Sequence, residues 1–89
     1  MKFYVTMTDK FLSGWGKADG QIAKYIYECD SYEEAQIVEE NARDRTDQKH
    51  INICTTKPYY NPRRYHVEWK NKENCPFWYE KGYFKHRDG

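Results

Sequence analysis

A chain of 89 residues with a formal net charge of +1 has room for one hydrophobic core but not for two. Only 38% of the residues are apolar, yet 18% are aromatic, so large rings must supply most of the buried area. No apolar stretch is long enough to cross a membrane, and no apolar leader follows the first methionine. We therefore expect a single small domain that is neither exported by a standard signal nor inserted in a membrane.

The cysteines and the charge distribution restrict the setting further. Cys29, Cys54 and Cys75 are widely spaced and form no CxxC pair, which favours free thiols in a reducing cytoplasm. Residues 28–48 carry eight acids and two arginines, whereas residues 49–89 carry nine basic residues and four acids. This asymmetry has two interpretations. It is either an ordinary solvated surface or a positive sheet side that meets an acidic partner.

The first part of the chain predicts two strands joined by a long loop. Residues 2–8 alternate, with Phe3, Val5 and Met7 on one face. Residues 9–20 form the loop, in which glycines flank Trp15. The second strand runs from about Gln21 to Cys29 and is apolar on both faces, which is typical of a central strand.

The stretch 30–45 carries the clearest helix signal. Ser31 and Glu34 have the spacing of a capping box, in which Ser31 accepts from the amide of Glu34 and the Glu34 carboxylate reaches back to the amide of Ser31. Ala35, Val38 and Ala42 recur at helical spacing, so one narrow apolar face is expected to lie close on a sheet.

The second half predicts two more strands and a ring-rich tail. Residues 50–55 point Ile51 and Ile53 inward, and residues 57–64 form a turn containing two prolines. Residues 65–70 alternate, and we expect Tyr65, Val67 and Trp69 to face the helix. The tail at 75–84 is expected to fold back over the core or a sheet edge.

These elements predict an α+β fold of order ββαββ, with one helix packed on a mainly antiparallel four-stranded sheet. We expect residues 1–85 to form the domain and residues 86–89 to fray. The predicted core is Phe3, Val5, Met7, Ala35, Val38, Ala42, Ile51, Ile53, Val67 and Trp69. The predicted polar, water-facing side of the sheet carries Tyr4, Thr6, Asn52, Cys54, His66, Glu68 and Lys70.

Two stretches carry a resemblance to a known group of proteins. TDKFLSGWG at residues 8–16 and INICTTKPYYNPRRY at residues 51–65 resemble small uncharacterised proteins encoded by tailed bacteriophages. The resemblance runs along most of the chain. It implies a phage origin and the cytoplasm of an infected bacterium as the setting, and it carries over no site residue.

Metal binding and catalysis are not expected. The candidate ligands are Cys29, His50, Cys54, His66 and Cys75, and their spacing does not bring four of them together. His66 and Glu68 share a strand face, yet no nucleophile motif, phosphate loop or metalloprotease motif accompanies them. We therefore predict no metal, no cofactor and no enzyme activity.

Single-stranded RNA or DNA binding is one open interpretation. It requires rings that stack on bases beside basic groups, and Tyr59, Tyr60, Arg63 and Arg64 supply both within one turn. A second candidate patch lies on the predicted outer sheet face and consists of Lys2, Tyr4, His66 and Lys70. The competing interpretation is that the two tyrosines only wedge the turn onto the core.

Protein binding is the interpretation that we place first. Trp15 at a glycine-flanked loop tip, together with Tyr59 and Tyr60, has the chemistry of an interface anchor. In the phage setting the partner is expected to be a host bacterial protein. Two alternatives stay open: Trp15 folds inward over the sheet edge, or the chain forms an oligomer, such as a dimer, that sequesters a small molecule between subunits.

Overall fold

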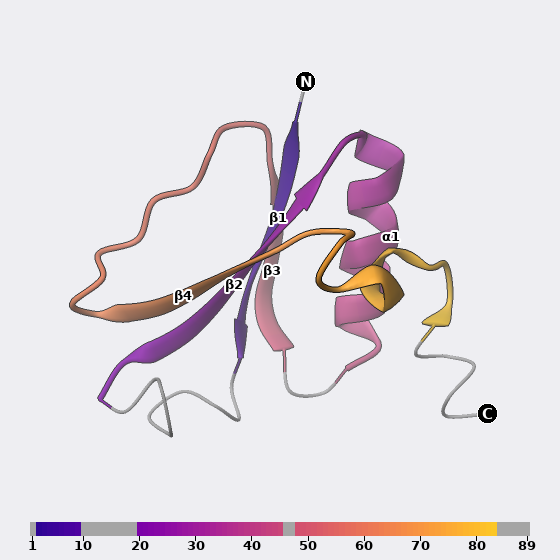
Figure 1. Cartoon of the computed structure of the whole chain (residues 1–89). Coiled ribbons are helices and arrows are strands. Elements are labelled where there is room, and N and C mark those ends of the chain that lie inside the picture. Colours follow the sequence, from indigo (N-terminus) through magenta and orange to yellow (C-terminus); the bar gives the residue numbers. More distant parts are fainter. Residues whose placement is uncertain (1, 10–19, 46–47, 84–89) are drawn as a thin grey trace.

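The computed structural model describes residues 2–9, 20–45 and 48–83. The elements are strands β1 (Phe3–Asp9) and β2 (Ile22–Cys29), helix α1 (Tyr32–Arg43), strands β3 (Gln48–Cys54) and β4 (Tyr65–Lys70), and the 3-10 helix η2 (Pro76–Tyr79). One sheet has the strand order β3-β1-β2-β4, and α1 packs against one face of it (Figure 1). The predicted α+β fold and the order ββαββ are confirmed.

The strand directions determine how the chain crosses the sheet. β1 pairs antiparallel with both β2 and β3, whereas β4 pairs parallel with β2. Strands β3 and β4 therefore run in the same direction at opposite edges, and the connection 55–64 has to cross from one edge to the other. Figure 1 shows this crossover on the side of the sheet away from α1. Both faces of the sheet are thus covered, one by α1 and one by the crossover.

Helix α1 begins at the predicted cap. The Ser31 hydroxyl accepts from the Glu34 amide at 3.1 Å. The Glu34 carboxylate accepts from the amide of Asp30 at 3.2 Å, one residue before the expected Ser31. The helix buries Ala35, Val38 and Ala42 as predicted. Its amino-terminal end is therefore held from both sides of the cap residue, which satisfies donors that the helix itself leaves unpaired.

The core between α1 and the sheet contains most of the predicted residues. Its fully buried members are Val5, Met7, Tyr27, Cys29, Ala35, Val38 and Ala42, and Phe3, Ile51 and Ile53 pack against them partly buried. Of the two possible inward faces of β2, the one with Tyr25, Tyr27 and Cys29 faces the helix. The small side chains of α1 let it lie close on these rings.

The predicted orientation of β4 is wrong. Trp69 lies beside Ile26 and Val67 beside Lys24, so both face away from α1. His66, beside Ala23, lies on the helix side instead. Trp69 is 41% exposed and is no part of the core under α1. The predicted alternation is right, but the crossover supplies a second cover, and the apolar side chains of β4 turn toward it.

The sheet face away from α1 is not the expected water-facing surface. Ile26 and Thr6 lie opposite each other on this face and are only 1% and 3% exposed. The Tyr4 and Trp69 rings meet edge to face beside them, with centroids 6.2 Å apart. A second, smaller core therefore lies on this side. Of the predicted outer residues, His66, Glu68 and Lys70 belong to the opposite face.

The ring-rich tail closes the helix side, as expected. The rings of Trp78 and Tyr79 lie 4.7 and 6.4 Å from the ring of Tyr27, measured between centroids. The side-chain amide of Asn41, which is fully buried, donates to the carbonyls of Trp78 at 2.8 Å and Glu80 at 2.9 Å. Asn41 thereby ties the middle of α1 to the tail.

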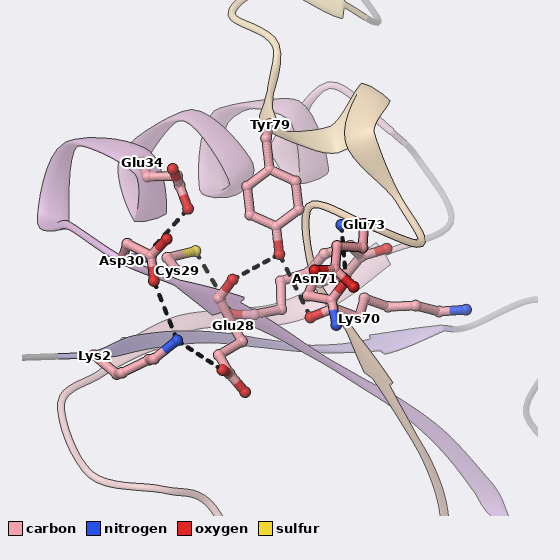
Figure 2. Close-up of polar contacts among 10 residues, drawn as sticks. Lys2, Glu28, Cys29, Asp30, Glu34, Lys70, Asn71, Glu73 and Tyr79 are labelled. Carbon is pink, nitrogen blue, oxygen red and sulfur yellow. Dashed lines mark hydrogen bonds and ion pairs between the residues drawn. The ribbon is translucent and has the colours of Figure 1, made fainter.

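Polar contacts hold the same end of the sheet together (Figure 2). The Tyr79 hydroxyl donates to the carbonyl of Glu28 at 2.8 Å, which joins the tail to the end of β2. Lys2 forms ion pairs with Glu28 at 3.0 Å and Asp30 at 3.1 Å. The amino terminus, the loop before α1 and the tail are therefore connected at one place.

Cys29 lies inside this connected end. Its thiol is buried and donates to the carbonyl of Tyr27 at 3.6 Å. Burial, with a smaller contribution from the nearby Glu34 carboxylate, raises the pKa of the Cys29 thiol to about 12. The group therefore stays a neutral thiol at physiological pH and behaves as a small core side chain.

Asn41→Ala is expected to lower the free energy of unfolding by about 2 kcal/mol, because two tail carbonyls in a half-buried site lose their donor. Urea denaturation followed by Trp fluorescence measures this change. Gln36→Ala, at an exposed position of the same helix, is the matched control and is expected to stay within about 0.5 kcal/mol of the parent. Equal stability of the two variants would contradict the role of Asn41 in tying α1 to the tail.

Candidate functional site

The turn at the end of the crossover is firmly anchored. The Asn61 carbonyl accepts from the amides of Arg64 at 3.0 Å and Tyr65 at 2.9 Å, and the Asn61 side chain accepts from the amide of Arg63 at 2.9 Å. The amide of Ile22 donates to the carbonyl of Arg64 at 3.0 Å. Two exposed arginine side chains therefore project from a backbone that is hydrogen-bonded within itself and to β2.

The two adjacent tyrosines of the crossover have different environments. The Tyr60 ring is half-buried and packs on Tyr65, with centroids 5.3 Å apart. The Lys24 ammonium lies 5.2 Å from the Tyr60 centroid and 6.0 Å from that of Tyr65. Tyr59 is 84% exposed. Tyr60 thus wedges the crossover onto the sheet, whereas Tyr59 presents its ring to solvent.

A second cation and ring pair lies farther along β4. The Lys57 ammonium lies 5.3 Å from the centroid of the Trp69 ring, and that ring also contacts Tyr4. We call this side of the molecule the aromatic-basic face. Its members are Tyr4, Lys24, Lys57, Tyr59, Tyr60, Arg63, Arg64, Tyr65 and Trp69.

The cations of this face lack acidic partners within the described part of the chain. Lys24, Lys57, Arg63 and Arg64 form no ion pair with a described carboxylate, whereas Lys2, Arg43, Lys70 and Lys72 each form at least one. Burial lowers the pKa of Lys24. Glu28, an acid on the same sheet face, is paired with Lys2. Within the described ranges the face therefore carries positive charge that no ion pair compensates, next to exposed rings, and such a surface attracts anions.

The opposite side of the molecule is acidic. A groove of about 460 Å³ runs along the outer surface of α1, lined by Glu33, Glu39 and Glu40 together with Gln36, Ile37, Arg43 and Lys81. The charge asymmetry of the sequence therefore corresponds to two faces of one molecule, with acids on the helix and, on the crossover side, cations that have no acidic partner among the described residues.

The structure brings together only part of the predicted site. Tyr59, Tyr60, Arg63 and Arg64 lie on the crossover as expected. His66 and Lys70 do not join them, because they lie on the helix side of β4. Trp15, the leading candidate for protein binding, falls outside the described residues.

Lys24, Lys57, Tyr65 and Trp69 are members of the face that the sequence interpretation did not assign to the site. The signal for Lys24 was present in the alternation of β2, where it shares a side with Ile22 and Ile26. For Lys57 and Trp69 the contact depends on the crossover, which brings together segments from opposite edges of the sheet. No local pattern reports such a contact.

His66, Glu68 and Lys70 form a polar strip on the helix side of β4. The Glu68 carboxylate lies 3.8 Å from both the His66 Nε2 atom and the Lys70 ammonium. The Lys70 ammonium also lies 5.8 Å from the centroid of the Tyr25 ring. The His66 Nε2 atom is buried and has no hydrogen-bond partner in the described structure. The strip is thus held by a loose Lys70–Glu68 ion pair, and the His66 ring nitrogen is unsatisfied.

Within the described ranges, no three His, Cys, Asp or Glu side chains are placed to hold a metal ion. No helix in those ranges is both long and apolar enough to cross a membrane. The chain matches no protein-family model, no curated protein and no solved structure in the comparisons made. The geometry of the aromatic-basic face is therefore the basis on which a function is inferred.

Proposed function

We propose that the protein is a non-enzymatic binding protein whose aromatic-basic face takes single-stranded RNA or DNA. The observation that carries the proposal is the set of cations without described acidic partners, at Lys24, Lys57, Arg63 and Arg64, interleaved with accessible rings. Proteins that bind single strands without sequence readout combine these two features, because phosphates need positive charge and bases need stacking surfaces.

Each part of the face has a distinct role in this proposal. Arg63 and Arg64 contact phosphates from an anchored turn, so little backbone entropy is lost on binding. Tyr59, which is 84% exposed, and Trp69, which is 41% exposed, offer rings on which bases stack. Base stacking on an aromatic ring contributes roughly 1–3 kcal/mol per base. Tyr60 and Lys24 hold the crossover in place rather than bind.

The nucleic-acid proposal is argued from described residues, whereas Trp15, the leading residue of the host-protein interpretation, falls outside them. The host bacterial protein as partner, the phage origin and the cytoplasm of an infected bacterium stay predictions from the sequence, as does an oligomer that sequesters a small molecule. Single-stranded nucleic acid is present in that cytoplasm, so the proposed ligand and the predicted setting are compatible.

Replacing both arginines tests the proposal. Fluorescence anisotropy with oligo(dT) and oligo(U) is measured from low to moderate salt. Arg63→Ala with Arg64→Ala is expected to reduce the slope of log K against log salt by about 1.4, since each phosphate contact on a single strand contributes about 0.7. Lys72→Ala with Lys81→Ala removes the same charge from the helix side and is expected to leave the slope unchanged.

Two outcomes would contradict the proposal. One is the absence of binding to either oligonucleotide at low salt. The other is an equal loss of slope in the arginine and lysine double variants, which would indicate a general charge effect. Capture of a bacterial protein by a chain that fails to bind nucleic acid would favour the host-protein interpretation.

A further inference from the structure

The two edges of the sheet differ in how they are protected. β3 carries an irregularity opposite β1, where the pairing register shifts between Thr6 and Thr8 and His50 adopts a φ of 53°. Such a bulge hinders the addition of another strand. β4 is a regular strand of six residues at the other end of the sheet, and no strand of the described structure lies beyond it. Its edge is the open one.

The hydrogen bonds show which backbone groups of β4 face outward. The carbonyl of Arg64 accepts from Ile22 of β2. Because successive residues of a strand direct their amide and carbonyl groups to alternate sides, those of His66 and Glu68 also face β2. Those of Val67 and Trp69 then face away from the sheet. These outward groups are available for a further strand.

We propose that a second copy of this chain pairs antiparallel along β4. The two-fold axis lies midway between the Val67 residues of the two copies. In this register His66 lies directly opposite Glu68 of the second copy, and Tyr65 lies opposite its Trp69. The strand is self-complementary, since two imidazole–carboxylate pairs and two aromatic pairs form at once. Such cross-strand pairs are the ones that stabilise antiparallel strands.

The two neighbouring registers lack this complementarity. A two-fold axis perpendicular to the sheet keeps side chains on the same face, so the register can shift only by an even number of residues. The shift in one direction places His66 opposite His66 of the second copy. The shift in the other direction places Glu68 opposite Glu68 of the second copy. Of the registers centred on His66, Val67 and Glu68, only the one centred on Val67 places the His66 imidazole opposite a carboxylate.

The dimer has a consequence for the aromatic-basic face. Because the two-fold axis is perpendicular to the sheet, both copies present this face on the same side. Trp69 of each copy then lies beside Tyr65 of the other, which gives one continuous surface across the interface. The dimer proposal itself depends only on β4 and not on the proposed function.

Charge reversal and restoration test the interface. Sedimentation equilibrium of the parent is expected to show a species of about twice the chain mass of 10.9 kDa. Glu68→Lys is expected to weaken dimerisation at least tenfold, because His66 then faces a cation. Adding His66→Glu restores an opposite-charge pair and is expected to return the dissociation constant to within about threefold of the parent. Lys49→Glu on the β3 edge is the control and should have no effect.

Crosslinking tests the register. In a background with Cys54→Ser and Cys75→Ser, Val67→Cys places two thiols on the two-fold axis, where opposed Cα atoms lie about 5.5 Å apart, within disulfide range. We expect Val67→Cys to form an interchain disulfide under mild oxidation and Glu68→Cys to form at least tenfold less. Equal crosslinking of both variants, a dimer insensitive to Glu68→Lys, or a parent that stays monomeric up to millimolar concentration would each overturn the proposal.

Discussion

Val38→Asp is expected to leave the chain unfolded at room temperature. Val38 is fully buried in the core between α1 and the sheet, beside Ala35 and Ala42. An unpaired buried charge costs several kcal/mol, and small domains have a free energy of unfolding of only about 5–15 kcal/mol. Far-ultraviolet circular dichroism as a function of temperature measures the effect.

The control for this substitution is Gln36→Asp, at an exposed position of the same helix. It introduces the same side chain without burial and is expected to change the melting temperature by only a few degrees. If Val38→Asp had the same melting temperature as Gln36→Asp, the buried face of α1 would be assigned incorrectly.

Ile26→Ala is expected to lower the free energy of unfolding by about 3 kcal/mol, the usual cost of removing a large aliphatic side chain from a packed site. Ile26 is 1% exposed on the sheet face away from α1. Ile22→Ala is the matched control, because Ile22 lies on the same strand and the same face yet is 38% exposed. Urea denaturation compares the two variants.

Ile26→Ala also tests whether the crossover side contains a real second core. If this face met water, as expected from the sequence, both alanine variants would lower the free energy of unfolding only slightly and by similar amounts. A clear excess cost for Ile26→Ala would instead support the crossover as a packed layer, which the aromatic-basic face requires as its base.

The sequence predicted the helix and its buried face well because both signals are local. The cap pairs Ser31 with Glu34, three residues away, and Ala35, Val38 and Ala42 repeat with the helical period. Strand β1 was equally predictable, because it lies between two other strands and its apolar side faces the helix. In these elements one local pattern has one structural solution.

The orientation of β4 shows where local patterns fail. Alternation establishes that Tyr65, Val67 and Trp69 share a side, but it does not say which layer covers that side. The sequence interpretation considered only α1 as a cover. Since the chain crosses from β3 to β4 over the opposite face, the apolar side chains of β4 turn to that face, and His66 and Lys70 leave the predicted site.

The candidate site was predictable only where its members are neighbours in the chain. Tyr59, Tyr60, Arg63 and Arg64 were found because they occur within one turn. Lys24 and Trp69 join them through strand pairing and through the crossover, which are long-range contacts. Trp15 remains a sequence-based candidate, because the structure does not describe the loop that carries it.

An NMR titration of the protein with oligo(dT) locates the bound strand residue by residue and so tests directly whether the aromatic-basic face binds it. We predict that the largest shifts occur at the Trp69 indole, at Tyr59 and at the amides of residues 57–65. Residues lining the groove along α1 should stay unchanged. Shifts centred on that groove, or the absence of shifts at low salt, would contradict the assignment of the aromatic-basic face as the binding surface.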